Sequence, residues 1–586
     1  MVLEDVLKAY DYVTRKRGLD PDKRPYIREV VSRIGSEWDK EGKVFLVEAP
    51  TGYGKTVISM AIAKYIMENG FKSIITYPLR TLIQQHSQLF KQLFSEEIIG
   101  TRFMHNMESP YLVKPVTLTT IDTLAMNALG LPPEDYESVL RSYRGSPWGY
   151  DGHYLFARSM VDLSDIVMDE VHLIMDSTKS LFFLRAFIEY IVSDLGRNVI
   201  LMTATLPDIL IENAKSAVPS RIVEYKFKQE ENDPFVKDRI RKNIHVHPLC
   251  GNGISCVESM LNKTECKRVL MVFNTVAEAV KFFVENKAVL QDKFCGNVLL
   301  LHSRFNENDR EKKTVKLNDI IHEDCFAIVS TQVIEAGVDI SSDLLITELA
   351  PANSLIQRMG RLARWNETEG ELAIWYDKEK LNGNNYTVYD GDLTKATLEY
   401  LTRNLDKIHY HLPNDYESKV GYRSFINYVY SKIPIPHGNE YSDFAGQLKK
   451  ISSASRNALN LLIKYEGSFV RESSIIGTLP VYNCDSIVNQ NLNIKIRTKD
   501  LIPLNIDSVI NLGKKGKLCP ATVTVSSGYN RELHIDSSDR SRRFINMISD
   551  LSKRRDTGYI TRKIIEMGIV GLITTSNYDE NTGLYW

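Results

Sequence analysis

The segment APTGYGKT (residues 49–56) carries residue types that bind phosphate groups. It follows an apolar run and opens a stretch with helical spacing, which is the context that a phosphate-binding loop requires. The two glycines let backbone N–H groups approach the phosphates, the lysine would reach the β- and γ-oxygens, and the hydroxyl after the lysine would hold Mg²⁺. The predicted nucleotide-binding residues are Thr51, Gly52, Gly54, Lys55 and Thr56. The first glycine of the strict pattern is Ala49 here, and the alternative is a glycine-rich turn without a ligand.

Two acids and a histidine follow another apolar run, in VMDEVHLIMD (residues 167–176). A strand that runs beside a phosphate loop and ends in carboxylates meets the magnesium of a bound nucleotide. Asp169 is therefore predicted to ligate Mg²⁺, mostly through water, and Glu170 to orient and deprotonate the attacking water. His172 is predicted to report the nucleotide state to a neighbouring domain. The alternative is a solvated pair of acids at a strand end.

The segment MTATLP (residues 202–207) closes the next predicted strand with two hydroxyl groups. Such a pattern alone is typical of a helix cap. Its place in the order of motifs makes Thr203 and Thr205 candidate coupling residues.

Three arginines surround a glycine in QRMGRLAR (residues 357–364). Arginines at this spacing usually form a solvated basic helix face. Opposite a phosphate loop, however, guanidinium groups neutralise charge on the transferring phosphoryl group, an effect of ~10³–10⁵ in rate. Arg361 and Arg364 are assigned this role, with Gln357 nearer the γ-phosphate.

Buried strands alternating with helices must position these groups. Near-continuous apolar runs predict strands at residues 43–50, 73–78, 165–172 and 198–206, and again at 268–274, 297–303, 325–331, 344–351 and 371–377. The clearest helix covers residues 55–69 and ends before Gly70. This pattern is typical of an α/β fold with mainly parallel sheets.

The chain is long enough for several domains, because a single core rarely organises 586 residues. The predicted divisions are a nucleotide-binding α/β domain, a second α/β domain with a cleft between the two, a helical linker, and a C-terminal accessory α+β domain. Their predicted ranges are 1–224, 225–385, 386–439 and 440–586.

Composition restricts the protein class less than the motifs do. Lys and Arg (73) nearly balance Asp and Glu (74), so nucleic-acid binding would need a local basic surface. Seven scattered cysteines without a CxxC pair predict reduced thiols rather than disulfides or a zinc site. No leader-like or membrane-spanning apolar stretch is visible, so a cytoplasmic protein without membrane contact is expected.

The ordered motifs resemble those of superfamily 2 DExH-box helicases. The set comprises APTGYGKT, YPLRTLIQQ, TTIDTL, DEVH, MTATLP, VFNTVAEA, LLHSRF, VSTQVIEAGVDIS and QRMGRLAR. The sequences of the LLHSRF and QVIEAGVDIS motifs are most similar to those of the CRISPR-associated helicase of type I interference systems. The resemblance covers about residues 20–380 and implies two tandem RecA-like domains that bind ATP and Mg²⁺ between them. Near the C-terminus, only SNYDENTGL (residues 576–584) resembles that family's final domain.

The resemblance also implies further site residues. Similar motifs contact the backbone of single-stranded nucleic acid and line the nucleotide side of the cleft. The implied nucleic-acid residues are Arg80, Thr81, Thr120, Thr275 and Thr331, and the implied nucleotide-side residues are Gly337 and Asp339. Hydroxyls and backbone amides on loops suit phosphate contacts, because they fix register without reading bases.

The sequence departs from the family at two points. Many relatives have Gln after a Pro-Tyr pair for reading adenine, whereas KRPYIREVV (residues 23–31) has Ile27 there, so phosphate binding is predicted more firmly than adenine specificity. Many members also carry an N-terminal HD nuclease. Here 48 residues precede Ala49, and none of the twelve histidines is followed by Asp, which predicts a stand-alone helicase subunit with a separate HD nuclease chain.

The leading functional hypothesis is an ATP-driven 3′→5′ translocase on single-stranded DNA. The resemblance implies the direction, the preference for DNA and recruitment to a crRNA-guided surveillance complex (Cascade). Two alternatives stay open: a superfamily 2 helicase outside CRISPR, acting in repair or on RNA, and an inactive clamp that binds nucleic acid without hydrolysis.

Overall fold

The structure is a computed structural model of the chain. The residues that it describes are 2–38, 41–103, 106–143, 153–175, 177–382, 388–433, 438–450, 454–470, 475–485, 496–525, 532–550 and 557–586. They fall into two compact units. The first comprises Met1–Tyr136, Asp151–Cys266 and Glu335–Ala458, and the second comprises Glu137–Tyr150, Lys267–Ile334 and Leu459–Trp586.

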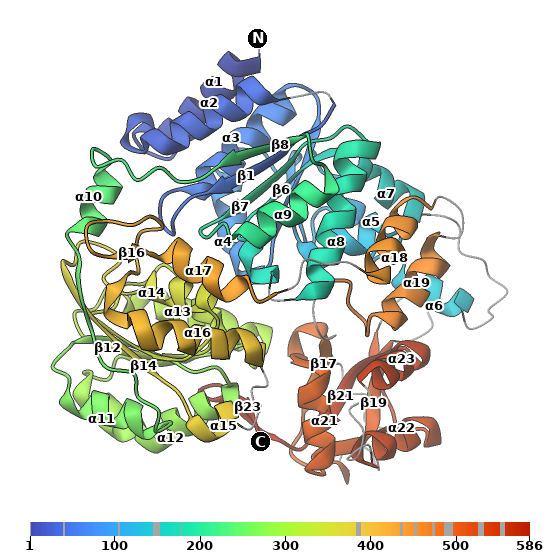
Figure 1. Cartoon of the computed structure of the whole chain (residues 1–586). Coiled ribbons are helices and arrows are strands. Elements are labelled where there is room, and N and C mark those ends of the chain that lie inside the picture. The colour runs from blue at the N-terminus through green and yellow to red at the C-terminus, as the bar shows by residue number, and fades with distance from the viewer. Residues whose placement is uncertain are drawn as a thin grey trace. The chain divides into compact units, whose positions relative to one another are not determined.

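An eight-stranded sheet is the centre of the first unit (Figure 1). Its order is β4-β3-β5-β2-β6-β7-β1-β8, and every neighbouring pair is parallel except β3 with β4. The strands are β1 (Val44–Glu48), β2 (Lys72–Tyr77), β3 (Ile99–Phe103), β4 (Asn106–Met107), β5 (Val116–Thr120), β6 (Ser164–Met168), β7 (Val199–Thr203) and β8 (Ile222–Tyr225). The four strands expected in this region are therefore present, and their carboxyl ends carry the candidate site residues.

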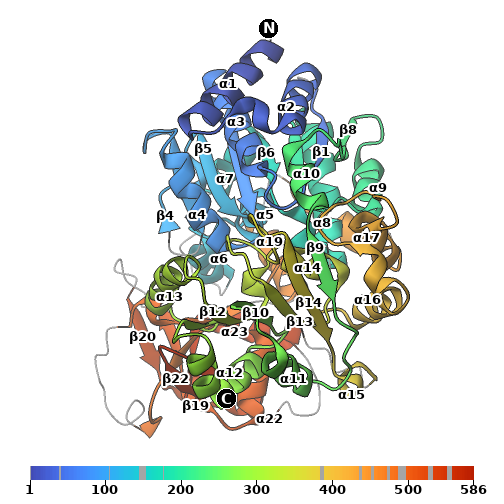
Figure 2. The same ribbon diagram turned by 90° about the vertical axis from the view of Figure 1, so that its left-hand side faces the viewer.

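Helices cover this sheet on both faces, since its strands are apolar on both sides. Alternate strand residues such as Phe45 and Val47 join one core with residues of α1 to α4. Figure 2 shows these four helices in a view turned by 90°. The helices of this part are α1 (Val2–Lys16), α2 (Pro25–Glu37), α3 (Lys55–Glu68), α4 (Arg80–Lys91), α5 (Ile121–Ala128), α7 (Tyr154–Asp162), α8 (Thr178–Ile188), α9 (Asp208–Ala217), α10 (Pro234–Ile240) and α11 (Ser255–Lys263). Helix α6 (Tyr136–Tyr143) belongs to the second unit from Glu137 on. The expected helix at 55–69 is α3.

The first unit also contains a second parallel run of strands, β13-β14-β9. These are β13 (Leu344–Glu348), β14 (Glu369–Trp375) and β9 (Asn243–Val246). The helices that follow are α14 (Ala352–Met359), α15 (Lys378–Asn382), α16 (Gly391–Asn404), α17 (Tyr422–Tyr430) and α18 (Asn439–Leu448). Helix α19 (Ala454–Lys464) belongs to the first unit up to Ala458 and to the second from Leu459 on. The segment that bears the three arginines begins in the last turn of α14, at Arg358, and continues beyond the helix, so it belongs to the same unit as the phosphate loop.

A buried ion pair ties α17 to the strand that precedes the phosphate loop. Glu48 ends β1 and is fully buried. Arg423 forms a forked contact with this carboxylate, with Nε 3.2 Å from Oε1, and Phe227 donates its backbone N–H to Oε2 at 3.0 Å. The pair therefore fixes the C-terminal end of β1 relative to the linker helices.

Replacing Arg423 by leucine is expected to destabilise the first unit by about 3–5 kcal/mol, because the substitution leaves an uncompensated buried carboxylate. Scanning calorimetry would show a lower midpoint for the transition of this unit. Arg403→Leu is the matched control, since Arg403 is 71% exposed and pairs with Glu399 at the surface of α16. Equal midpoints in the two variants would contradict the expectation, and Glu48→Gln added to Arg423→Leu should recover part of the loss.

The second unit combines a parallel run with a mixed sheet. The run β11-β12-β10 consists of β11 (Val298–Leu301), β12 (Phe326–Ser330) and β10 (Arg268–Val272), with α12 (Val276–Lys293) and α13 (Glu307–Ile320). The mixed sheet has the order β18-β17-β21-β19-β20. Its elements are β17 (Ile475–Pro480), β18 (Ile502–Asn505), α21 (Ile506–Lys514), β19 (Leu518–Val525), β20 (Leu533–Asp536), α22 (Asp539–Asp550), α23 (Thr557–Met567) and β21 (Ile569–Thr574).

The chain ends in a hairpin, β22 (Asn577–Asp579) and β23 (Gly583–Tyr585), that packs on the LLHSRF segment of the same unit. His302 Nε2 lies 2.9 Å from the carbonyl oxygen of Thr582, and Nδ1 accepts the backbone N–H of Arg304 at 3.1 Å. Tyr578 donates its hydroxyl to Asp309 at 2.6 Å. Both ring nitrogens of the histidine are thus used, which fixes a neutral tautomer with the proton on Nε2.

The buried His302 predicts acid sensitivity of the second unit. Burial lowers the pKa of His302 to about 3, whereas an unfolded histidine titrates near ~6.5. The unfolded chain therefore binds a proton that the folded chain excludes, and stability that is present above pH ~6.5 is lost as the pH falls toward 3. Between pH 7.5 and 5.0 this loss should amount to about 2 kcal/mol.

His302→Gln is expected to remove most of that acid-dependent loss, although the variant starts from a lower stability at neutral pH. Unfolding midpoints at the two pH values measure the difference. The matched control is His534→Gln, since His534 is exposed on β20 of the same unit. An unchanged acid dependence in His302→Gln would contradict the assignment of a neutral buried imidazole.

The expected fold class is confirmed: parallel α/β sheets flanked by helices, followed by helices and a C-terminal α+β part. All nine expected strands are observed, with ends that differ by a few residues. The domain ranges stay a prediction. The first unit joins residues of the first two predicted domains with linker residues, and the second joins residues 267–334 to the C-terminal part.

The prediction that all cysteines are reduced is wrong for four of them. Cys250 is bonded to Cys256, and Cys484 to Cys519, with Cα atoms 6.1 and 5.4 Å apart. In the first pair, a turn with Gly253 at φ 65° brings together residues six apart, and in the second the chain returns through the mixed sheet. The spacing of the cysteines along the chain does not reveal that either pair comes together in the fold. Reduced cysteines therefore no longer support the expectation of a reducing compartment.

Within the described ranges, no helix has the length and apolar character needed to cross a membrane.

Candidate nucleotide site

The phosphate loop joins β1 to α3 as the sequence predicts. Gly52 and Gly54 have φ values of 84° and 115°, a left-handed backbone that favours glycine. Gly54 is the N-cap of α3, so the first free N–H groups of that helix and its positive dipole end point at the loop. Thr56 lies in the first turn of α3 and is half-buried. This geometry can hold an anionic phosphate.

Lys55 is held beside the predicted catalytic acid. Its side chain is 6% exposed, and Nζ donates to the carbonyl oxygen of Ala49 at 3.1 Å. The same Nζ lies 3.2 Å from Oε1 of Glu170. A phosphate group in the loop would offer this ammonium a second anionic partner between the loop and the carboxylate.

The two acids follow directly after β6. Glu170 adopts a left-handed backbone (φ 52°), and its N–H donates to Oδ1 of Asp169 at 2.8 Å. Burial and the charge of Glu170 raise the pKa of Asp169 to about 7. Burial acts to raise the pKa of Glu170 as well, but Lys55, His172 and Arg361 hold it below its usual range. The pair therefore provides one firmly ionised carboxylate and one that a cation would keep ionised.

The candidate coupling residues form one hydrogen-bonded chain. His172 Nδ1 lies 3.1 Å from Oγ1 of Thr203, which donates to the backbone oxygen of Thr205 at 2.7 Å. The Thr205 hydroxyl donates to Oδ1 of Asn353 on α14 at 2.9 Å. Burial lowers the pKa of His172 to about 4, so the ring is neutral at physiological pH. The chain joins the end of β6 to the helix that leads to the arginines.

The three arginines of the QRMGRLAR segment have different environments. Arg358 is fully buried and forms an ion pair with Glu335, with Nε 2.9 Å from Oε1. Arg361 donates through Nη2 to the carbonyl oxygen of Glu335 at 2.9 Å, and burial together with Arg364 lowers its pKa to about 9. Arg364 pairs with Asp339 at 2.9 Å and is 15% exposed. Arg358 is thus a core residue.

The arginine segment meets the phosphate loop within the first unit. Thr51 donates its hydroxyl to Oε1 of Gln357 at 3.2 Å. An ideal Cβ atom built on Gly52 would lie 3.7 Å from Nη2 of Arg364. The structure therefore brings together the glycine loop, the acids and the guanidinium groups that the sequence predicts to share a site.

Several buried polar atoms around this loop have no hydrogen-bond partner. They are Oε2 of Glu170, Nε2 of His172, Nδ2 of Asn353 and Nε2 of Gln357. Buried polar groups are normally paired, and a group of unpaired ones marks a place for a polar ligand or water. Together with Lys55, this set of donors and acceptors fits a triphosphate with its magnesium ion: the Thr56 hydroxyl and the Asp169 carboxylate suit a hard cation.

The residues implied to contact nucleic acid lie in both units. Arg80 and Thr81 begin α4 in the first unit, where Thr120 caps α5 by accepting the N–H of Thr123 at 3.2 Å. In the second unit, Thr275 caps α12, and Thr331 is buried after β12. The two capping hydroxyls already have partners, so a phosphate would have to share these hydroxyls or use neighbouring backbone amides.

The two implied nucleotide-side residues have separate surroundings. Asp339 pairs with Arg364 and accepts the indole N–H of Trp365 at 3.3 Å. Gly337 accepts, through its carbonyl oxygen, a hydrogen bond from the Gln85 side chain of α4, and an ideal Cβ on Gly337 would lie 3.1 Å from Oγ1 of Thr81. Gly337 thus adjoins the helix that carries two implied nucleic-acid residues.

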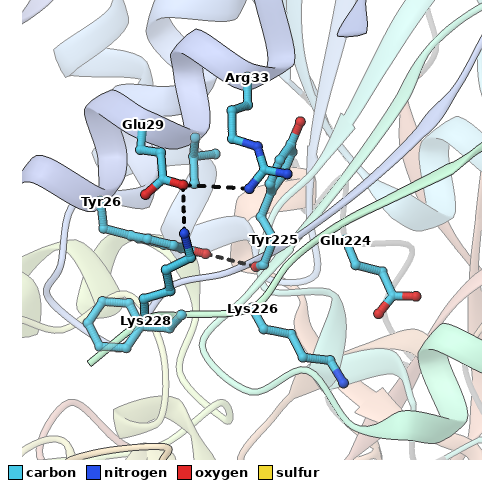
Figure 3. A pocket seen from close by; sticks show the side chains of 9 residues that line it. Tyr26, Glu29, Arg33, Glu224, Tyr225, Lys226 and Lys228 are labelled. Carbon is cyan, nitrogen blue, oxygen red and sulfur yellow. Dashed lines mark hydrogen bonds and ion pairs between the residues drawn. The ribbon is translucent and has the colours of Figure 1, made fainter. Parts of the chain in front are cut away.

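Ile27, at the usual position of the adenine-reading Gln, is buried on α2 and offers no polar group. A groove of about 290 Å³ runs along the other side of this helix, between it and residues 224–228 (Figure 3). Glu29 pairs there with Lys228 at 3.0 Å and with Arg33 at 3.5 Å. No residue of the phosphate loop lines the groove, so we do not assign it to the nucleotide.

Three site residues were missed by the motif analysis. Glu335 organises two arginines and lies inside the quoted QVIEAGVDIS motif, where its carboxylate between apolar residues was the available signal. Asn353 continues the coupling chain from PANSL. Arg239 of α10 lies beside Gly52 and has no motif around it.

Two family models match the chain. Residues 28–212 match the DEAD/DEAH box helicase family, and residues 265–367 match the C-terminal part of the CRISPR-associated nuclease/helicase Cas3. Among curated proteins, the chain is 26% identical over 457 residues to the CRISPR-associated nuclease/helicase Cas3 of Methanothermobacter thermautotrophicus, covering 68% of the chain and 50% of that protein. It is 26% identical to the CRISPR-associated helicase Cas3 of Thermoproteus tenax, covering 63% and 61%.

The chain is similar to the CRISPR-associated Cas3 helicases. The resemblance predicted from the motifs is thereby confirmed. The crystal structure of T. fusca Cas3 with ADP superposes with a TM-score of 0.54 at 16% identity, covering 80% of this chain and 62% of that one. A pre-nicking CRISPR RNA-guided surveillance complex contains a chain that superposes with a TM-score of 0.52 at 16% identity, covering 93% and 68%. At this identity, the Cas3 structures support the fold.

The chain spans about half the length of the Methanothermobacter Cas3 protein. The phosphate loop and the acids fall in the DEAD/DEAH segment, and Gln357, Arg361 and Arg364 in the Cas3-like segment. The activity of the whole relatives is therefore a matter for proposal.

Proposed function

We propose that this chain is an ATP-dependent helicase that translocates 3′→5′ along single-stranded DNA in type I CRISPR interference. The observation that carries the proposal is the convergence on one glycine loop of Lys55 with Glu170, 3.2 Å apart, and of Gln357 with Thr51, 3.2 Å apart. Such a set is suited to phosphoryl transfer to water, where catalysis is mostly positioning and charge stabilisation.

Each residue has a defined task in this proposal. The loop amides and Lys55 bind the phosphates, and Glu170 accepts a proton from the attacking water. Arg361 and Arg364 neutralise the charge that develops on the γ-phosphoryl group. Bound magnesium, held by Thr56 and Asp169, would supply further charge neutralisation on the phosphate oxygens. His172, Thr203 and Thr205 relay the state of this site to α14.

The partners in the proposal follow from the relatives. Arg80, Thr81, Thr120, Thr275 and Thr331 contact the phosphates of single-stranded DNA. A Cas3-like chain in a surveillance complex supports docking on a crRNA-guided complex of the Cascade type. No histidine of the chain is followed by Asp, and the described residues contain no group of three or more His, Cys, Asp or Glu placed to hold a metal. The proposal includes a separate HD nuclease subunit that cleaves the DNA.

ATP hydrolysis with different polynucleotides tests the proposal. Single-stranded DNA should stimulate turnover more than single-stranded RNA or duplex DNA. The logarithm of the affinity for the single strand should fall with the logarithm of the salt concentration, at a slope near −0.7 per neutralised phosphate. Preferential stimulation by RNA would favour a helicase outside CRISPR, and nucleotide binding without turnover would favour the inactive clamp.

Direction is measured separately, by displacement of streptavidin from biotin at either end of a DNA strand. A 3′→5′ translocase displaces it from the 5′ end. Displacement from the 3′ end alone would contradict the proposed direction while leaving ATP hydrolysis intact.

A further inference from the structure

The short helix α10 (Pro234–Ile240) carries an arginine into the nucleotide site. The Arg239 side chain is 9% exposed, and an ideal Cβ on Gly52 would lie 3.8 Å from its Nη2. Helix α10 belongs to neither matched family segment, since these end at residue 212 and begin again at residue 265. The arginine thus lies in the connector between the two matched segments.

Arg239 holds the backbone next to Arg364. Its Nη1 donates to the carbonyl oxygen of Arg364 at 2.9 Å and lies 3.5 Å from that of Ala363. Ala363 has a φ of 45°, a left-handed conformation that costs a non-glycine residue about 1–3 kcal/mol. A strained bend persists only where its surroundings impose it. Arg239 is one of the groups that impose it.

Other contacts complete the support of this bend. Ala363 donates its N–H to the carbonyl oxygen of Ser342 at 2.9 Å, and Arg364 donates its N–H to Oγ of Ser341 at 2.8 Å. These bonds fix the N–H groups of the bend. Arg239 binds its carbonyl groups, so the N–H groups and the carbonyl groups of Ala363 and Arg364 are both held by hydrogen bonds.

The same helix also contacts the phosphate loop. Asp233 caps α10 by accepting the N–H of Phe235 at 2.8 Å, and it accepts the hydroxyl of Tyr53. The rings of Tyr53 and Phe235 pack edge to face at 5.0 Å, and the Arg239 guanidinium lies 4.8 Å from the centre of the Phe235 ring. A displacement of Tyr53 within the loop therefore reaches Arg239 through one aromatic ring.

The charge of Arg239 is poorly compensated by carboxylates. Its partner Asp238 lies at 4.0 Å, near the limit of an ion pair. Burial lowers the pKa of Arg239 to about 10, with Arg364 and Arg24 acting in the same direction, so the group stays charged at neutral pH. Burying a cation that is held mainly by carbonyl oxygens and an aromatic ring costs desolvation free energy, which favours a role of this side chain in the site.

We propose that Arg239 is a positioning residue for ATP hydrolysis: it fixes the Ala363–Arg364 bend so that the Arg364 guanidinium faces the phosphate loop at Gly52. This inference rests on the proposed function. Through Tyr53, Asp233 and Phe235, the connector helix senses the loop and sets the arginine accordingly. The residue acts through Arg364 and needs no contact of its own with the nucleotide.

The test compares Arg239→Met and Arg239→Lys with Arg241→Met. Arg241 is the matched control, because it follows the same helix, is 67% exposed and pairs with Asp238 at 3.0 Å. The readouts are kcat and KM for ATP, the unfolding midpoint, and the affinities for ADP and for ADP with aluminium fluoride, an analogue of the transferring phosphoryl group. They separate the chemical step from ground-state binding.

We expect Arg239→Met to lower kcat by ~10–10²-fold and to weaken the aluminium fluoride complex in parallel, with ADP affinity within about twofold of wild type. Arg239→Lys should recover at least part of kcat, because an ammonium can donate to two carbonyl oxygens. Lys242 does so already, to Trp365 and Glu367, at 2.8 and 2.9 Å. Arg241→Met should match the wild type.

Two results would overturn the inference. One is a kcat of Arg239→Met equal to that of Arg241→Met. The other is a loss of ADP and aluminium fluoride affinities in equal measure with a lower unfolding midpoint, which indicates a merely structural role. If Arg239→Met does not fold, the comparison of Arg239→Lys with wild type in the two affinities decides in the same way. A wild-type chain without turnover overturns the proposed function and this inference together, whereas turnover that survives Arg239→Met overturns this inference alone.

Discussion

Replacing Glu170 by glutamine should lower ATP hydrolysis at least ~10²-fold while leaving nucleotide bound. Glutamine keeps the shape of the side chain and an oxygen near Lys55, which lies 3.2 Å from Oε1 in the wild type. It cannot accept a proton from water, and the step loses its general base. Turnover and nucleotide affinity are measured side by side, in the presence of single-stranded DNA.

Two further variants give this result its meaning. Lys55→Ala should lose turnover to a similar extent and weaken nucleotide binding as well, because the ammonium binds phosphate in the ground state. Glu189→Gln is the control, since Glu189 is 30% exposed in the same unit and pairs with Lys449 at 3.7 Å. Turnover near wild type in Glu170→Gln and Lys55→Ala would refute the assignment of the site.

The strands that could be predicted from the sequence are those whose pattern follows from a single local requirement, burial on both faces. Strands covered on both faces need apolar residues throughout, and the expected runs became β1, β2, β6 and β7. The strand β3 was not predicted, because its polar residue Arg102 looks exposed in the sequence. Arg102 is buried, with Nε 2.5 Å from Oε1 of Glu134, a partner 32 residues away.

The site divides in the same way. Phosphate-loop glycines and strand-end acids are local patterns, since the loop and the acids each follow their own strand directly. The difference between Arg358 and Arg361 is not local, because it depends on which of them the Glu335 carboxylate reaches. Arg239 has no sequence signal at all: its role depends on a bend at Ala363, more than a hundred residues further along the chain.

The different contacts of Arg358 and Arg361 with Glu335 predict different effects of substitution at these two positions. Replacing Arg361 by methionine should lower kcat at least ~10²-fold with little change in the unfolding midpoint. Arg361 donates to a backbone oxygen of Glu335, so the loss of this contact leaves the Glu335 carboxylate paired with Arg358. Its pKa of about 9 keeps it charged at neutral pH, as neutralising a phosphoryl group requires.

In contrast to Arg361→Met, Arg358→Met is expected to lower the stability of the first unit. This guanidinium pairs with the buried Glu335 carboxylate at 2.9 Å and donates to Thr347 at 2.9 Å. Its loss should cost about 3–5 kcal/mol, because the buried carboxylate loses its cationic partner and keeps only the Tyr389 hydroxyl as a side-chain donor among the contacts described. Calorimetric midpoints and kcat, measured on both variants, separate the two arginines. A large fall in midpoint for Arg361→Met with kcat per folded molecule preserved would show that it, too, serves the core, and the charge opposite the phosphate loop would then have to come from Arg364 alone.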